Sequence, residues 1–336
     1  MIIPVKTQNG SYNIYLKRGA LAKAGTYFEL NRKVLVVTDS GVPAEYARTV
    51  AACCKDPIVI TIEMGEKSKN IETFQYLLTC MVEHAFTRTD CIVAVGGGVV
   101  GDLCGFAASA YMRGIDFYNI PTTVLSEVDS SIGGKTAIDF MGYKNIVGAF
   151  YPPMGVLIDP DTLQTLPKRQ ISNGLAEVVK MAMIGDSELF DILEHEDIAS
   201  NLDTIIERSL YIKKYVVEND EKEAGLRKTL NFGHTLAHAI ESANSMETYY
   251  HGECVGIGMI PMCSPNVRAR LISVLQKLDL PTETAYTAEE LLEACRHDKK
   301  ASGELITVVF VHEIGKAELQ TMPFAQYAAL VKEWLG

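Results

Sequence analysis

Three of the seven histidines of this chain fall in one short stretch, where their spacing could serve metal or proton chemistry. His234 and His238 are four residues apart, and His251 follows a short distance later. On a helix, residues four apart project from one face, about 40° apart in azimuth. At that spacing both imidazoles could bind one divalent ion, or one could bind it while the other transfers protons. Two capped or half-buried helix histidines are the structural alternative.

Two charged residues interrupt an apolar helical segment upstream of these histidines. Glu177 and Lys180 lie three residues apart among Ala, Val and Met. Charges in such a helix are rarely left unpaired, because their desolvation is costly. The two could form a structural ion pair, or Glu177 could complete a Glu/His/His metal site with an open position for substrate.

A glycine-rich segment, GGGVVG at residues 96–101, follows a strand-like run and precedes a helical one. Glycines at such a place allow backbone N–H groups to approach a pyrophosphate at a helix N-terminus. The preceding strand is not the first of its domain and no acidic residue follows about 20 positions later, so a tight turn is the alternative. Asp102 would repel a phosphate and suits a sugar or substrate hydroxyl. Asp39 ends a strand, where a ribose-binding carboxylate would stand.

A second glycine-containing segment, GGKT at residues 133–136, resembles the end of a Walker A loop. That motif requires glycine at position 129, where this chain has Asp129, so we reject ATP binding there. Lys135, Lys144 and Asn145 still fall in a region rich in Gly, Ser and Asp. Their side chains could converge on a ligand, or they could belong to a solvated loop.

The elements that must position these residues change character along the chain. In the first half, strand-like runs at 34–37, 58–62, 91–95 and 117–120 alternate with helical segments such as 71–85 and 101–112, which indicates βαβ units and a parallel sheet. Helical segments then follow one another at 172–185, 187–195, 204–219, 227–243 and 252–260, before a strand at 306–310 and a helix at 323–335. We predict an α/β N-terminal domain with a parallel Rossmann-like sheet at 1–158, and a mostly α-helical C-terminal domain at 159–336.

Composition excludes several classes of protein. The 336 residues are 48% hydrophobic and 22% charged, with a formal net charge of −11, which argues against nucleic acid as a partner. A small anionic ligand stays compatible, bound by a local cluster of Lys and Arg. No apolar run approaches the ~18 residues of a membrane span, and the N-terminus lacks signal-peptide features, so we expect no membrane partner and a cytoplasmic location. Eight dispersed cysteines without a C-x-x-C pair argue against structural zinc and disulfides.

Taken together, these motifs resemble the 3-dehydroquinate synthase family over nearly the whole chain. The matching segments are GEK (65–67), GGGVVGD (96–102), RG (113–114), PTT (121–123), DSSIGGKTAID (129–139), YKN (143–145), GAFYPP (148–153), GLAEVVK (174–180), GLRKTLNFGHTLAHAIE (225–241), HGE (251–253) and DKK (298–300). An ordered series of this kind is far more specific than any one motif. The resemblance implies conversion of 3-deoxy-D-arabino-heptulosonate 7-phosphate, a small anionic sugar phosphate, to 3-dehydroquinate and phosphate. It also implies NAD⁺ and one Zn²⁺ or Co²⁺ ion as cofactors, and a homodimer.

The resemblance further implies roles for individual residues. Glu177, His234 and His251 would bind the metal ion, and His238 would contact substrate and handle protons. The NAD⁺ site would be lined by Asp39, Glu66, Lys69, Gly96, Gly97, Gly98, Asp102, Thr122, Thr123, Lys144, Thr162, Thr165 and Asn173. The substrate would be held by Arg113, Asp129, Lys135, Asn145, Lys180, Lys213, Arg227, Asn231 and Lys299, with Lys300 as the alternative to Lys299 and Glu223 as a further acid/base candidate. Asn231, one turn before His234, is expected to project toward the same cleft.

Three rival functions can be weighed on particular residues. Glycerol dehydrogenase-like polyol dehydrogenases would release NADH, but they typically have aspartate where Glu177 stands. Other sugar phosphate cyclases share the reaction logic, but typically alter Asp102 and Leu230-Asn231, and a valiolone-type cyclase would lack His238. A non-catalytic scaffold would have lost a metal ligand or a phosphate-site lysine, and this chain retains all of them.

One stretch departs from the family pattern. Pro261 and Pro265 stand where the family continues a helix after its third metal ligand. Proline in a helix interior breaks or kinks the helix, so we expect an interruption there and a shorter connection to the next helix.

Overall fold

The computed structural model describes residues 1–8, 10–244, 248–298 and 305–335, and it divides into two compact units, Met1–Leu166 and Pro167–Gly336. The sequence places this boundary earlier, after residue 158. The difference has a local cause, because the short helix η5 (Pro160–Thr165) is tied to the first unit by the preceding residue. The carboxylate of Asp159 accepts the backbone N–H groups of Gly19 and Leu21, each at 2.9 Å.

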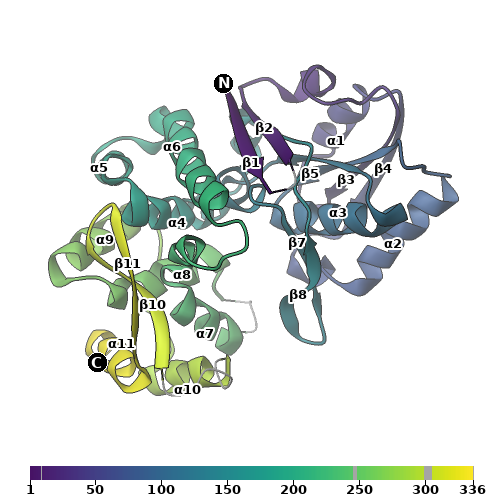
Figure 1. The fold of residues 1–336 in the computed structure, drawn as a ribbon. Helices are drawn as coiled ribbons and strands as arrows, with labels where there is room; N and C mark the ends of the chain where they lie inside the picture. Colours follow the sequence, from purple (N-terminus) through teal and green to yellow (C-terminus); the bar gives the residue numbers. More distant parts are fainter. Residues whose placement is uncertain (9, 245–247, 299–304, 336) are drawn as a thin grey trace. The chain divides into compact units, whose positions relative to one another are not determined.

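The described part of the first unit is built on a seven-stranded sheet with the order β1-β2-β9-β6-β5-β3-β4 (Figure 1). β1 and β2 pair antiparallel, and every other neighbouring pair is parallel. The strands are β1 (Ile2–Thr7), β2 (Gly10–Leu16), β3 (Lys33–Asp39), β4 (Asp56–Ile62), β5 (Cys91–Gly96), β6 (Asp116–Pro121) and β9 (Gly155–Ile158). The predicted fold class is therefore confirmed, and four predicted strands correspond to β3, β4, β5 and β6.

Alternation along the central strands divides the core of this unit between the two faces of the sheet. Leu35 and Val37 point to one face and pack with α2 (Ile71–Glu83) and α3 (Gly98–Ala110). Val34 and Val36 point to the other face and pack with η1 (Leu21–Thr26) and α1 (Ala44–Ala51). All four side chains are fully buried. Strands covered on both faces read as continuous apolar runs, which is why these segments stand out in the sequence.

The order of the strands creates a switch point between β3 and β5, because the chain runs outward to β4 on one side and to β6 and β9 on the other. In parallel sheets, ligands bind beyond the carboxyl ends of the strands at such a point. The elements that follow the strands there are η2 (Glu66–Ser68), the start of α3 and the π-helical turn η4 (Ser126–Ser130). A separate hairpin, β7 (Lys135–Phe140) and β8 (Tyr143–Phe150), extends from this unit (Figure 1).

The second unit is mostly helical and is organised around α4 (Lys168–Gly185), whose residues from Ser172 to Ile184 are all buried. Its β structure in the described residues is the antiparallel hairpin β10 (Leu305–Glu313) and β11 (Lys316–Pro323). The remaining helices include α5 (Ser187–His195), α6 (Ile198–Asn219), α10 (Ala288–Asp298) and α11 (Phe324–Leu335). None of the described helices is both long and apolar enough to cross a membrane.

The predicted helix at 227–243 is wrong as a single element. The structure has η6 (Leu226–Asn231) and, after an interruption, α7 (His234–Asn244). Gly233 between them has φ of +80°, a left-handed conformation that ends one helix before the next begins. Asn231 consequently does not lie one helical turn before His234.

The predicted interruption near Pro261 and Pro265 is confirmed. α8 (His251–Met259) continues only into the short turn η7 (Ile260–Met262), and α9 (Pro265–Lys277) starts afresh with proline in its first turn. Proline is tolerated there because the first N–H groups of a helix have no intrahelical acceptor. His251 begins α8 and lies upstream of the break.

Candidate active site

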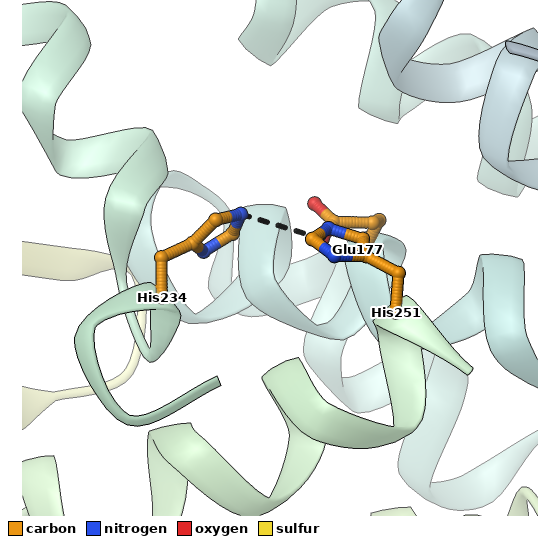
Figure 2. Close-up of side chains that lie close together, drawn as sticks. All are labelled: Glu177, His234 and His251. Carbon is orange, nitrogen blue, oxygen red and sulfur yellow. Dashed lines mark ion pairs between the residues drawn. The ribbon is translucent and has the colours of Figure 1, made fainter. Parts of the chain in front are cut away.

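Three side chains from three helices of the second unit converge on one point. Glu177 comes from the middle of α4, while His234 and His251 are the first residues of α7 and α8 (Figure 2). Among the residues that the structure describes, one ligand atom from each lies within 4.8 Å of the others. His251 Nε2 is 3.5 Å and His234 Nε2 is 3.9 Å from Glu177 Oε1.

Local contacts explain why His251 can begin a helix at this place. Tyr250 caps α8, and the Glu253 carboxylate accepts the Tyr250 N–H at 2.8 Å. Arg169 of α4 donates to both oxygens of Glu253, at 2.7 and 2.8 Å, and its guanidinium lies over the Tyr250 ring. The first turn of α8 is therefore anchored to α4, the helix that carries Glu177. Sequence analysis missed Arg169, although the Tyr250-x-x-Glu253 spacing is a capping pattern.

The environment of Glu177, His234 and His251, which form the trio of the candidate site, sets their protonation. Burial disfavours the charged form of Glu177, but Lys180, His251 and His234 outweigh it and hold the pKa of this carboxyl well below its usual range. Burial, aided by Lys180, lowers the pKa of His234 to about 3. For His251 burial acts in the same direction, but the carboxylates of Glu177 and Glu241 on its two sides raise its pKa to about 10.

The trio has the properties of a divalent metal site. Glu177 is fully buried, and neither of its carboxylate oxygens has a hydrogen-bond partner among the described residues. Lys180, three residues along the same helix, forms an ion pair with it. One carboxylate oxygen and two imidazole nitrogens form a donor set that suits Zn²⁺ or Co²⁺ and leaves a coordination position open. The residues therefore fit the metal ion that the sequence implies.

His238 lies one helical turn after His234 on α7 and is exposed to solvent. The two rings meet edge to face, with centroids 5.6 Å apart. His238 is not a member of the described trio. Its position beside a ligand, with access to solvent, suits a group that exchanges protons with a substrate.

Three predicted cationic residues of the second unit are buried. They are Lys180 of α4, Lys213 of α6 and Arg227 of η6. A buried cation is stable when an anion compensates it, and Lys180 forms such an ion pair with Glu177. The structure thus brings these three predicted residues into the same helical unit as the trio.

The loop before α7 gathers two further predicted residues. Asn231 Nδ2 donates to Glu223 Oε1 at 2.6 Å. Asp220, which sequence analysis missed, accepts the N–H groups of Ala224, Gly225 and Arg227. These backbone hydrogen bonds lower the pKa of the Asp220 carboxyl. The loop that carries Glu223 and Arg227 is therefore held by a single carboxylate.

In the first unit, several predicted residues meet at the switch point of the sheet. Asp39 ends β3, and burial raises the pKa of its carboxyl. The backbone of Gly96 on the neighbouring strand β5 accepts the Thr122 N–H at 3.0 Å. Gly97 precedes α3, where no side chain among the described residues caps the helix. Uncapped N–H groups at a helix start next to a strand end are suited to a pyrophosphate.

The two glycines at the start of α3 leave a cradle that other residues would fill. A Cβ atom at Gly97 would lie 3.3 Å from Thr123 Cγ2, and one at Gly98 would lie 3.1 Å from Ser130 Oγ. A ligand can therefore approach the backbone closely at this turn only because residues 97 and 98 have no side chains. The residues present fit a dinucleotide.

Asp102, whose charge beside the glycines was unexpected, has a cationic partner. Lys69 is buried and its Nζ lies 2.5 Å from Asp102 Oδ2 and 3.8 Å from Glu66 Oε1. Burial raises the pKa of Asp102 to about 6, although Lys69 opposes the shift. The Lys69 Nζ also donates to Asn145 Oδ1 at 2.5 Å. Asn145, predicted to hold substrate, thus belongs to the same polar network as Glu66, Lys69 and Asp102.

A β-bulge aims Asn145 at this network. The register of the β7–β8 hairpin shifts between Ile138 and Phe140, so that residues 144–146 lie opposite Asp139 alone. Asp139 Oδ1 accepts the Asn145 N–H at 2.8 Å, and Asn145 has φ of +54°. Bulges often re-aim side chains next to active sites. Sequence analysis missed Asp139, because the pairing that places it is visible only in the folded hairpin.

The remaining predicted residues are more dispersed. Lys135, at the start of β7, lines a small cavity together with Asp102 and Ser130. Asp129 lies in η4, one residue before Ser130. Arg113 follows the C-terminal end of α3 and precedes β6, so it lies at the opposite edge of the sheet from the glycine turn. Lys299 and its alternative Lys300 lie outside the described residues.

Three residues predicted for the NAD⁺ site make structural contacts. Tyr46 of α1 donates to the Thr162 carbonyl at 3.3 Å and its hydroxyl lies 3.0 Å from Thr165 Oγ1, so both threonines of η5 pack against α1. Asn173 lies on α4 in the second unit, one turn before Glu177. Its Oδ1 accepts the Gly252 N–H at 2.7 Å and so ties α4 to α8.

The fold is similar to that of solved sugar phosphate cyclases. A solved 2-deoxy-scyllo-inosose synthase, complexed with carbaglucose-6-phosphate, NAD⁺ and Co²⁺, matches with a TM-score of 0.89 over 100% of both chains at 24% identity. The 2-epi-5-epi-valiolone synthase of Streptomyces hygroscopicus, with NAD⁺ and Zn²⁺ bound, matches with a TM-score of 0.86 at 27% identity over 98% of both chains. A glycerol dehydrogenase from Schizosaccharomyces pombe matches less closely, with a TM-score of 0.68 over 95% of this chain and 88% of its own.

The particular family follows from the sequence relatives. The family described as 3-dehydroquinate synthase N-terminal matches residues 59–173, and 3-dehydroquinate synthase C-terminal matches residues 174–301. The 3-dehydroquinate synthase of Streptococcus suis is 40% identical over 97% of this chain and 98% of its own length. That of Enterococcus faecalis is 41% identical over 98% of both chains. The chain belongs to the 3-dehydroquinate synthase family.

Proposed function

We propose that the protein converts 3-deoxy-D-arabino-heptulosonate 7-phosphate to 3-dehydroquinate and inorganic phosphate. One observation carries the proposal: the buried Glu177, His234 and His251 trio occurs in a chain that is about 40% identical, over nearly its whole length, to curated 3-dehydroquinate synthases. In this reaction the C5 hydroxyl is oxidised transiently, phosphate is eliminated, the C5 ketone is reduced again, and the opened ring closes by an internal aldol step.

The cofactors in this proposal are NAD⁺ and one divalent metal ion, Zn²⁺ or Co²⁺. Related synthases contain NAD⁺ together with one of these ions, and the residues of this chain fit both groups. NAD⁺ supplies reversible hydride acceptance at C5, and the ion supplies Lewis acidity toward the C5 oxygen. Glu177, His234 and His251 would hold the ion. His238, beside His234 and exposed, would take up the proton that leaves the C5 hydroxyl.

The anionic substrate would be held by the cationic residues. Lys180, Lys213 and Arg227 of the second unit are buried and would contact the phosphate or carboxylate, together with Lys299. Lys135 of the first unit would add further positive charge, and Asp129, Asn145 and Asn231 would bind hydroxyl groups. Charge-assisted contacts to phosphate are the strong ones. They would hold the leaving group while its own oxygen assists removal of the neighbouring C–H proton.

NAD⁺ would be held at the switch point of the sheet. Its pyrophosphate would lie at the start of α3, over Gly97 and Gly98, and Asp39 would contact a ribose hydroxyl. Glu66, Lys69, Asp102, Thr122, Thr123 and Lys144 would line the rest of the site.

The contribution of the hairpin bulge to NAD⁺ binding can be tested by mutation. Asp139→Ala removes the acceptor of the Asn145 N–H, so the turn that carries Lys144 and Asn145 should relax away from Lys69. A lost hydrogen bond of this kind is worth about 1 kcal/mol, which corresponds to about a fivefold weaker Kd for NAD⁺ by calorimetry. Asp139→Asn keeps an acceptor oxygen and should bind NAD⁺ almost normally. Equal weakening by both variants would show that the charge of Asp139, not its contact to Asn145, matters.

The proposed reaction has a characteristic stoichiometry. Metal-loaded protein is incubated with the heptulosonate phosphate and with NAD⁺ at a small fraction of the substrate concentration. We expect one phosphate released for each dehydroquinate formed and no net NADH, because the hydride returns to the substrate. Stoichiometric NADH would instead indicate a polyol dehydrogenase. Absence of phosphate release would overturn the proposal.

A homodimer, implied by the family resemblance, and the cytoplasmic location expected from the sequence complete the proposal. Light scattering of the purified protein at several concentrations tests the first. A mass close to that of one chain at all concentrations would contradict it.

A further inference from the structure

Glu241 is a buried carboxylate beside the trio to which the proposed reaction gives no role. Its side chain is 8% exposed, and it lies on α7, seven residues after His234. Glu241 Oε1 lies 3.1 Å from Nδ1 of His251. On α7 the positions of His234, His238 and Glu241 follow the i, i+4, i+7 spacing of one helix face. α7 packs against α8, the helix that begins with His251.

Both ring nitrogens of His251 are therefore accounted for. Nε2 lies 3.5 Å from Glu177 Oε1, on the side of the trio, and Nδ1 lies against Glu241. An imidazole can bind a metal ion only through a nitrogen that carries no proton, so the other nitrogen must carry the proton and donate it. When a metal ion is bound, Glu241 would therefore accept the Nδ1 proton of His251 and leave the lone pair of Nε2 for the ion.

The second histidine of the trio is oriented in the same sense by a weaker acceptor. Nδ1 of His234 lies 3.1 Å from the carbonyl oxygen of Phe232. Both histidines thus present Nε2 to the trio, one oriented by a neutral backbone group and the other by a carboxylate. A carboxylate makes the ring that it binds more basic than a carbonyl does. The His251 side chain is 35% exposed, against 14% for His234, so the His251 ring depends more on a partner to fix its orientation.

We propose that Glu241 is the positioning residue of the metal centre: it holds the His251 ring in the orientation and tautomer that bind the ion. This inference rests on the proposed function, because it concerns the same metal site. It assigns to Glu241 a share of the metal affinity and no contact with substrate. The alternative is a purely structural role, in which Glu241 only stabilises the packing of α7 on α8.

The test measures metal binding directly, with Co²⁺ and Zn²⁺ as probes. Metal is removed from the whole protein, and the affinity of wild type, Glu241→Ala and Glu241→Gln is measured by competition with a chromophoric chelator. Loss of such an orienting partner typically costs 10- to 100-fold in metal affinity, so we expect a loss of about that size for Glu241→Ala. Glu241→Gln, which keeps the shape and an acceptor oxygen, should recover part of it. The visible absorption of bound Co²⁺ should also shift in Glu241→Ala.

A matched control separates positioning from general stability. Glu218 is a glutamate of the same unit, paired with Lys214 on α6; Glu218→Gln should bind both ions with wild-type affinity. If Glu241→Ala does not fold, Glu241→Gln carries the test through its affinity and its Co²⁺ spectrum. Wild-type affinity and spectrum in the Glu241 variants would overturn the inference. The proposed function would then still stand, provided that wild-type protein binds metal and releases phosphate. If wild-type protein does neither, the proposed function itself fails.

Discussion

His251→Ala is expected to lose both the metal ion and the activity, whereas His238→Ala should lose activity and keep the ion. The described trio includes His251 but not His238, so only the first change removes a ligand. Lewis acid stabilisation is worth several kcal/mol, which corresponds to a loss of dehydroquinate formation of about a thousandfold. Removal of a proton-transfer group costs a comparable 10²- to 10⁴-fold. Activity alone therefore does not distinguish the two roles, and metal content does.

The measurement is the amount of bound Zn²⁺ or Co²⁺ after gel filtration, alongside the rate of phosphate release. Ser242→Ala provides a control on the same helix, since the hydroxyl of Ser242 contacts only the His238 carbonyl in the described structure. Equal metal loss in His238→Ala and His251→Ala would contradict the division of roles. Retention of metal by His251→Ala would contradict the trio itself.

Gly252→Ala should destabilise the second unit by about 3 kcal/mol and weaken metal binding, whereas Gly256→Ala on the same helix should do neither. A Cβ at Gly252 would lie 1.9 Å from the carbonyl oxygen of Asn173, a backbone atom of α4 that cannot rotate away. α8 would have to move off α4, and the movement would carry His251 away from Glu177. At Gly256 the nearest atom is Leu275 Cδ2 at 3.3 Å, the end of a flexible side chain.

Gly256→Ala also gains helix propensity of about 1 kcal/mol, which offsets the slight crowding. Urea denaturation of the metal-free proteins measures the change in stability, and competition for Zn²⁺ measures the change in metal binding. Similar stabilities for the two variants would show that α4 and α8 can separate without cost. The contact between Asn173 and Gly252 would then not position the metal centre.

Much of the first unit could be predicted from the sequence because its signals are local. The run Val34–Val37 is fully buried in a parallel sheet, and an uninterrupted apolar segment is the direct consequence of burial on both faces. The glycine turn at 96–98 likewise follows from a strand end that meets a helix start. The β7–β8 hairpin escaped prediction, because β8 is largely exposed and its residues lack an apolar pattern.

The helical unit shows where local reasoning fails. A continuous helix at 227–243 was a reasonable reading of the periodicity, but Gly233 adopts φ of +80° and the chain turns there. The reason is tertiary: a Cβ at Gly233 would collide with the backbone of α8, at 2.8 Å from the Val255 carbonyl oxygen. Asn231 therefore contacts Glu223 instead of standing one turn before His234.

The sequence by itself determined which chemical groups the protein has and the order in which they occur. Glu177 and the histidines could be named as candidates because ligand chemistry depends on residue type, and short spacings define a helix face. Lys213 and Arg227 were named only through the family resemblance. The sequence could not show by spacing alone whether His238 or His251 shares the ion with His234. Only the tertiary structure brings His251 to Glu177, sets Glu241 behind its ring and aims Asn145 at Lys69. These contacts join segments far apart in the chain, and their geometry depends on how closely the helices and strands that carry them can pack.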